Sequence, residues 1–156
     1  MSARRGGIGP GLALCVLFGL PAIASAQRLD LAVTPATVVI PTGDPDLVPV
    51  VSSTPATIEY RVRQNNNNPW TLTVLAGGDL VSGAASIAIS ELTWVATPSP
   101  PFRNGTLSSA SAQTVAAGVG NVANPSRGSI TFRLTNSWTY DAGIYTQSLL
   151  FTLSAP

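Results

Sequence analysis

Apolar and polar side chains alternate along much of this sequence, and the alternation predicts β-strands. The clearest segments are residues 29–33, 58–62, 70–74, 130–134 and 145–153. Successive side chains of a strand point to opposite faces, so this spacing turns one face to a core and the other to water. No long segment shows the three-to-four spacing of an amphipathic helix. The pattern therefore predicts an all-β chain.

Shorter apolar segments predict additional strands and the connections between them. We expect brief strands at 38–40, 87–89 and 114–116, and a further strand at 92–96. The parity of the apolar positions changes between 87–89 and 92–96, which predicts a bulge or kink near Glu91.

Turn-forming residues separate these segments. The asparagine run before Pro69 predicts a tight turn, so we expect 58–62 and 70–74 to form a hairpin. Segments 98–105 and 117–126 are expected to be the most mobile loops, and 136–143 is expected to be a turn region.

About seven or eight short strands with Gly, Pro and Asn turns predict an antiparallel Greek-key β-sandwich, with an antiparallel barrel as the alternative. Asp141–Tyr145 also resembles the Asp-x-Gly-x-Tyr corner of immunoglobulin-like sandwiches. In that corner the tyrosine hydroxyl bonds to a nearby backbone group. The resemblance covers the corner alone, because no cysteine follows two residues after Tyr145.

The first 26 residues have the features of a secretory signal peptide. Arg4 and Arg5 precede an apolar run at 11–20, and Ala24-Ser25-Ala26 is a small-x-small cleavage site. The run is shorter than the roughly 20 residues that a bilayer core requires. We expect cleavage after Ala26, and we expect residues 27–156 to form a single domain. The signal peptide predicts that this domain is secreted or resides in the cell envelope. Cys15 is the only cysteine, so that domain is expected to contain no disulfide.

Charge and composition limit the classes of function that we expect for this protein. Removing Arg4 and Arg5 from the eight basic residues leaves six arginines against seven acidic residues, a net charge of −1. No basic patch is visible in the sequence, so nucleic acid is not an expected partner. Without His, Lys or Cys in residues 27–156, a Ser-His-Asp triad is impossible and a zinc site has only carboxylates to use. We expect no catalysis, no cofactor and no metal. Asp44-Pro45-Asp46 is interpreted as a turn rather than a calcium site.

Aromatic residues supply candidate binding sites. Trp70 and Trp94 lie in alternating segments and are expected in the core, whereas Trp138 and Tyr140 lie in a turn region. Exposed aromatic rings could stack on sugars, so Trp138 and Tyr140 are candidate ligand-binding residues.

The chain also resembles the WxL domain of bacterial cell-surface proteins. Trp70-Thr71-Leu72 is similar to the internal Trp-x-Leu motif, and the C-terminal Phe151-Thr152-Leu153 is similar to the terminal one, with Phe151 in place of tryptophan. The resemblance implies a secreted β-rich domain that attaches non-covalently to peptidoglycan. It also implies Trp70, Leu72, Phe151 and Leu153 as candidate binding residues.

These observations predict a non-catalytic module of the cell envelope that binds wall polymer or a neighbouring surface protein. One alternative is a subunit of an exported fibre, completed by strand addition from the segment 29–33. The other is a secreted carbohydrate-binding module that uses Trp138 and Tyr140.

Overall fold

The computed structural model describes residues 27–64 and 67–156. The expected signal peptide, residues 1–26, lies outside the described residues. The regular secondary structure of the described chain is almost entirely β-strand, with one short 3-10 helix, η1. The elements are β1 (Arg28–Thr34), β2 (Val50–Ser52), β3 (Ala56–Arg63), β4 (Pro69–Ala76), β5 (Leu80–Ser82), β6 (Ala85–Ile87), η1 (Ile89–Glu91), β7 (Leu92–Thr97), β8 (Gly105–Thr106), β9 (Gln113–Val119), β10 (Val122–Thr135) and β11 (Leu149–Ser154).

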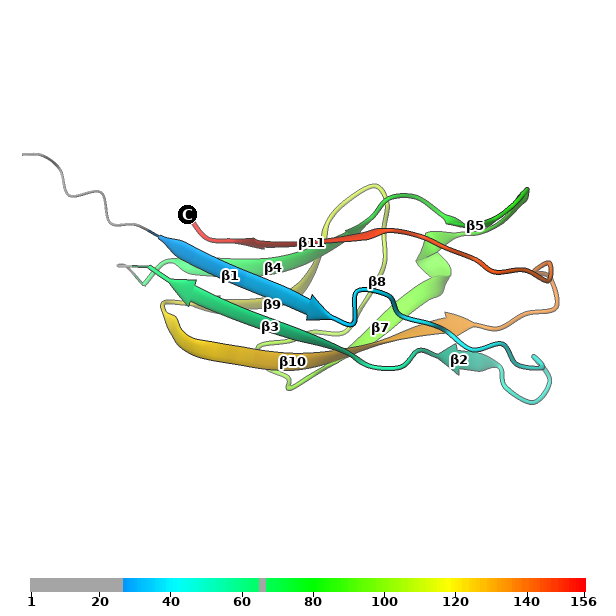
Figure 1. The fold of residues 1–156 in the computed structure, drawn as a ribbon, viewed down its shortest axis with the longest axis horizontal. Coiled ribbons are helices and arrows are strands. Elements are labelled where there is room, and N and C mark those ends of the chain that lie inside the picture. The colour runs from blue at the N-terminus through cyan, green and yellow to red at the C-terminus, as the bar shows by residue number, and fades with distance from the viewer. Residues whose placement is uncertain (1–26, 65–66) are drawn as a thin grey trace, which may run out of the picture.

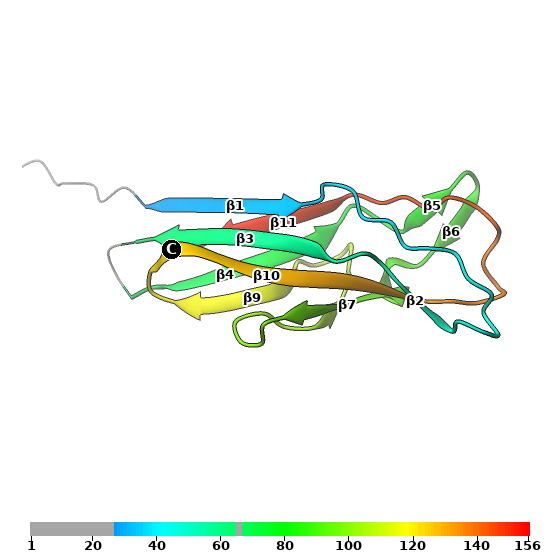
Figure 2. The same cartoon turned by 60° about the horizontal axis from the view of Figure 1, so that its bottom comes forward.

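Two antiparallel sheets pack face to face (Figure 1). The larger sheet has the order β1-β3-β10-β7-β8, and β2 also pairs with β10. The smaller sheet has the order β11-β4-β9, and β5 pairs with β6 in a separate hairpin. Figure 2 shows the two layers from another side. Neighbouring strands are often distant in sequence, and the sheets are not closed into a barrel. The predicted all-β antiparallel sandwich is therefore confirmed over the barrel alternative.

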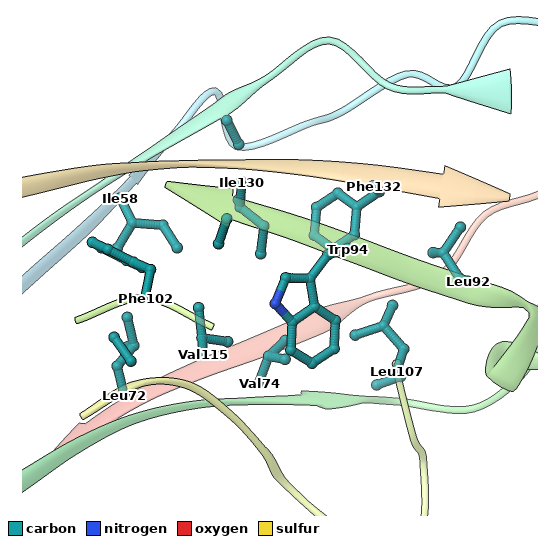
Figure 3. Close-up of a cluster of buried hydrophobic side chains, with 14 of the residues drawn as sticks. Ile58, Leu72, Val74, Leu92, Trp94, Phe102, Leu107, Val115, Ile130 and Phe132 are labelled. Carbon is teal, nitrogen blue, oxygen red and sulfur yellow. The ribbon is translucent and has the colours of Figure 1, made fainter. Parts of the chain in front are cut away.

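The core lies between the sheets and is filled by the inward-facing residues of the alternating strands. Trp94, Phe102 and Ile130 are buried there (Figure 3). Tyr60 packs against Trp70 with ring centroids 4.9 Å apart, and against Phe102 edge-on at 5.9 Å. Every second residue of a strand points into this core, as expected for strands that are covered on one face.

The strands at 29–33, 58–62, 70–74, 92–96 and 130–134 are confirmed as parts of β1, β3, β4, β7 and β10. The predicted hairpin between 58–62 and 70–74 is wrong. β3 pairs with β1 and β10, whereas β4 pairs with β11 and β9. The two strands belong to different sheets, so their apolar faces oppose each other across the core.

Two other expectations are corrected around the loops. Segment 38–40 is not a strand, although Val38 and Ile40 pack against the core. Segment 117–126 is not a loop, because β9 runs to Val119 and β10 begins at Val122. Gly120 allows the tight turn between them, since its φ of +77° lies in the left-handed region that favours glycine.

The kink predicted near Glu91 is confirmed, and it takes the form of η1 rather than a bulge. The strand expected at 87–89 is shifted to β6, just before η1. At the C-terminus, inward and outward positions alternate from Tyr145 onward as predicted, but the ladder begins only at Leu149. The described part of the chain contains no helix of the length and apolar character needed to cross a membrane.

Candidate functional site

The two Trp-x-Leu-like segments lie side by side in the smaller sheet. β11 pairs with β4 so that Leu153 is opposite Leu72, and Phe151 is opposite Val74. Trp70 is 3% exposed and Leu72 is fully buried, whereas Phe151 and Leu153 are half-buried. The structure therefore brings the four residues together, but it places Trp70 and Leu72 in the core, where they offer no surface to a ligand.

A second candidate surface lies at the opposite end of the sandwich from the C-terminus. We call it the loop end and define it as residues 41–50 and 136–141. Asn136 joins its two segments: the Asn136 amide donates to the carbonyl oxygens of Gly43, at 2.9 Å, and Val48, at 3.0 Å. The Asn136 backbone N–H also donates to the Pro49 carbonyl at 2.8 Å. One side chain thus holds two distant segments in a fixed arrangement.

Trp138 is the most exposed aromatic side chain of the candidate set. It is 68% exposed, yet its indole N–H donates to Asp46 Oδ1 at 3.1 Å. Asp46 belongs to a turn in which its own backbone N–H donates to Asp44 Oδ1 at 2.9 Å. The turn therefore orients the ring while leaving its surface open to solvent.

Tyr140 differs from Trp138 in its surroundings. The side chain is half-buried and packs against the core. Burial raises the pKa of the Tyr140 hydroxyl above its usual value, and the negative charge of Glu91 raises it further. Of the two aromatic candidates in this turn region, Trp138 therefore presents the larger free surface.

The loop end also carries exposed aliphatic side chains. Leu47 is 79% exposed, and Val48 and Val50 are exposed as well. An exposed apolar group rimmed by polar residues is typical of a surface that binds a partner or ligand.

The carboxylates serve mainly structural roles in the described residues. Asp79 Oδ1 accepts a hydrogen bond from the Ile89 backbone N–H at 2.9 Å, and Asp44 caps the turn that contains Asp46. Asp30 and Glu59 form ion pairs on the larger sheet. The described residues hold no cluster of three His, Cys, Asp or Glu side chains placed to ligate a metal. The geometry of Asp44 and Asp46 is that of a turn.

Sequence reasoning identified Trp138 but missed the partner that orients it. Asp46 is 92 residues away in sequence, and no local pattern connects it to a tryptophan. The exposed valines and Leu47 were also missed, because isolated apolar residues among prolines carry no periodic signal.

Comparison with known proteins finds no match for this chain among family models, curated proteins or solved structures. The resemblance to the WxL domain consequently stays a prediction.

Proposed function

We propose that this protein is an exported, non-catalytic module of the cell envelope that binds a glycan through Trp138. The observation that carries the proposal is the combination of a mostly exposed indole ring and a hydrogen bond that fixes its orientation. A ring held in place before binding loses less conformational freedom when a ligand docks on it.

The chemistry of the loop end fits a sugar. The flat face of the indole can pack on the apolar face of a pyranose ring. The carboxylates of Asp44 and Asp46 are exposed and can accept hydrogen bonds from hydroxyl groups. Binding on this platform requires neither a deep cleft nor a titrating residue, which agrees with a protein that performs no catalysis.

Retention on purified peptidoglycan and on a panel of neutral polysaccharides tests the proposal. The protein is purified from the medium or envelope of expressing cells, and its N-terminus is sequenced to test cleavage after Ala26. Trp138→Ala is expected to weaken retention about tenfold or more, in the range of a tryptophan hot spot. Trp138→Phe should keep part of the binding, because a ring remains for stacking.

Ile144→Ala is the matched control, since Ile144 is 86% exposed and apolar but not aromatic. It should leave retention unchanged. Asp46→Ala should produce an intermediate loss by freeing the ring, whereas Asp46→Asn should retain an acceptor for the indole N–H. Equal retention by Trp138→Ala and the wild type on every glycan that binds would contradict the proposal.

A further inference from the structure

Charged side chains of opposite sign are separated on this molecule. Five of the six arginines between residues 27 and 156 lie on the outer face of the larger sheet. Five of the seven acidic residues lie in loops, turns or η1 instead, and all five are exposed. The arginines are Arg28, Arg61, Arg63, Arg127 and Arg133, and the acidic residues are Asp44, Asp46, Asp79, Glu91 and Asp141.

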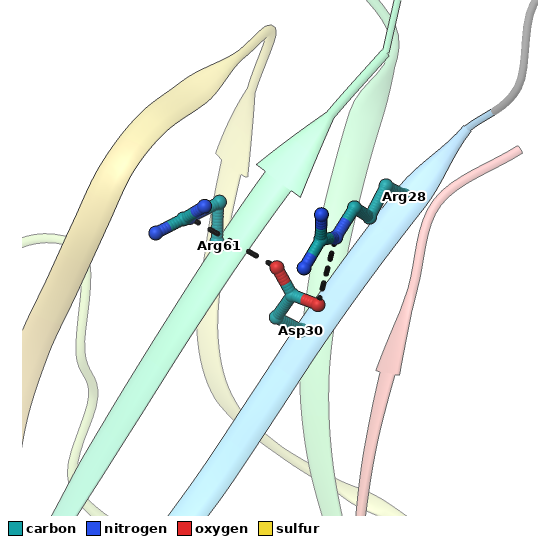
Figure 4. Close-up of polar contacts among 3 residues, drawn as sticks. All are labelled: Arg28, Asp30 and Arg61. Carbon is teal, nitrogen blue, oxygen red and sulfur yellow. Dashed lines mark hydrogen bonds and ion pairs between the residues drawn. The ribbon is translucent and has the colours of Figure 1, made fainter.

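The positive charge is concentrated where β1 begins and β3 ends. Arg28 and Arg63 are directly opposite each other in the β1–β3 ladder. Asp30 lies between Arg28, at 3.1 Å, and Arg61, at 3.9 Å, so one carboxylate is shared by two guanidinium groups (Figure 4). We call Arg28, Arg61 and Arg63 the arginine corner. Its three positive charges exceed the single charge of Asp30 by two.

The arginine corner borders a shallow hollow of about 230 Å³ in the face of the sheet. Its lining includes two arginines, Arg28 and Arg61, two acidic residues, Asp30 and Glu59, and Pro125. Two guanidinium groups and two carboxylates therefore line the hollow, and the surplus of positive charge beside it comes from Arg63, which is opposite Arg28 in the β1–β3 ladder.

The loop end lies at the other end of the sandwich (Figure 1) and has the complementary character. Asp44, Asp46 and Asp141 are exposed there, and Leu47 lies beside Asp46. Within the described residues all ion pairs are on the larger sheet, so the carboxylates of the loop end have no cationic partner there. The loop end therefore offers negative charge next to an exposed aliphatic residue.

We propose that the loop end of one copy docks on the arginine corner of a second copy, forming head-to-tail chains. Complementary charge carries the proposal, because the same molecule presents both halves of the contact at opposite ends. Matching potentials favour encounter and set orientation. A contact between two different surfaces of one protein is heterologous, so it extends to further copies unless its rotation closes a ring.

Sedimentation velocity of the exported protein tests the association. At about 20 mM salt the average mass should rise with protein concentration beyond that of a dimer. At about 500 mM salt it should fall to that of the monomer, because the screening length shortens from tens of ångströms toward a few. A protein that stays monomeric at low salt, or whose mass stops at a dimer, would refute the proposal.

Single variants locate the contact. Arg63→Glu should weaken association about tenfold or more, whereas Arg103→Glu, which makes the same change in net charge away from the arginine corner, should change it less than about twofold. Equal effects of the two variants would mean that net charge alone controls association. Circular dichroism confirms that each variant folds.

Mixing two variants gives the sharpest result. Arg28→Glu/Arg63→Glu carries negative charge at both ends, and Asp44→Asn/Asp141→Lys reduces or reverses the charge of the loop end. Asn at position 44 retains a side-chain acceptor for the turn, and the Asp141 contact with Tyr145 uses only the backbone carbonyl. Each variant alone should remain monomeric, and their mixture should associate. A monomeric mixture of two folded variants would overturn the proposed pairing of surfaces. Arg28→Glu/Arg63→Glu leaves the whole loop end unchanged, so glycan retention by this variant is measured independently of its association.

Discussion

Gly128 leaves less room for a Cβ than the other glycines of the described strands, and Gly128→Ala tests how tightly the core around it is packed. Gly128 is buried on β10, opposite Ile58 of β3. A Cβ added there would overlap the Cε2 and Cζ atoms of Phe102. Phe102 is fully buried and packs edge-on against Tyr60, so its ring has little space into which it can move. Forcing a methyl group into a filled core costs about 1–3 kcal/mol.

The backbone around Phe102 also resists displacement. The Phe102 N–H donates to the Pro98 carbonyl at 3.1 Å, and the Arg103 N–H donates to the Val115 carbonyl at 2.8 Å. We therefore expect Gly128→Ala to destabilise the fold by about 2 kcal/mol. Urea unfolding, followed by tryptophan fluorescence and by circular dichroism, measures the change. Ser129→Ala is the control: it alters the next residue, on the opposite face, and should change stability by less than about 0.5 kcal/mol.

Phe102→Leu tests whether the Phe102 ring and a methyl group at position 128 compete for the same space. Alone it should cost about 1–2 kcal/mol, because a smaller side chain leaves a cavity. Combined with Gly128→Ala it should restore space for the new methyl group. The double variant should then be more stable than the sum of the single effects by about 1 kcal/mol. Additivity within about 0.3 kcal/mol would show that the ring and the glycine do not compete for the same volume.

Three further predictions follow from single contacts. Ser53→Ala should cost about 1–3 kcal/mol in urea unfolding, because Ser53 Oγ accepts the buried Phe132 N–H at 3.0 Å and alanine cannot replace that acceptor. Tyr145→Phe should cost only about 0.5–1.5 kcal/mol by the same assay, because its exposed hydroxyl donates one hydrogen bond, to the Asp141 carbonyl at 2.9 Å. The raised pKa of Tyr140 means that the folded state holds this proton more tightly than the unfolded chain. The protonated Tyr140 hydroxyl therefore contributes fully to the free energy of unfolding below its unfolded-state pKa, near 10. This contribution is lost as the pH rises through the folded-state pKa of Tyr140. Absorbance titration of tyrosinate should lose a phase above the usual tyrosine pKa in Tyr140→Phe, and an unchanged titration would contradict the assignment.

Local patterns in the sequence were sufficient to predict the strands and the faces that they bury. Ile58, Tyr60 and Val62 alternate in the sequence, and all three are buried in β3. The hydrogen bond of the tyrosine corner could also be predicted, because Tyr145 and Asp141 are only four residues apart. The structure contains this bond, from the Tyr145 hydroxyl to the Asp141 carbonyl oxygen. Both features depend on neighbouring residues, whose geometry the backbone fixes directly.

Strand partners could not be predicted in the same way. Alternation shows which face of a strand is apolar, but the same pattern fits a neighbour in one sheet and a neighbour across the core. β3 and β4 illustrate this ambiguity, since the asparagine-rich connection fits a hairpin turn and also fits a crossing between sheets. The segment 29–33, considered as a donated strand, is paired with β3 of its own chain in every position. Its pairing depends on residues about thirty positions away, which no local turn signal specifies.

The loop 98–105 shows a similar limit. Three prolines made it resemble a mobile connection, yet Phe102 is fully buried and the Trp94 indole N–H donates to the Arg103 carbonyl at 2.8 Å. A single apolar residue in a proline-rich loop forms no periodic pattern in the sequence. Its burial depends instead on the shape of the core that it enters. Gly105 supports the same packing, because a Cβ there would lie 2.5 Å from the Trp94 ring.

The arrangement of charge also shows why net charge alone did not reveal a binding surface. Strand parity places Arg61 and Arg63 on one face of β3, and pairing with β1 adds Arg28 to the same corner. The resulting surplus is two charges, because Asp30 offsets one of the three guanidinium groups. A protein that follows a nucleic-acid backbone commonly contacts about six to ten phosphates, which requires a longer positive surface than this corner. A short loop with two or three carboxylates matches the corner in both extent and charge. The expectation about nucleic acid stays a prediction, and this distribution of charge supports the proposed contact with the loop end of a second copy.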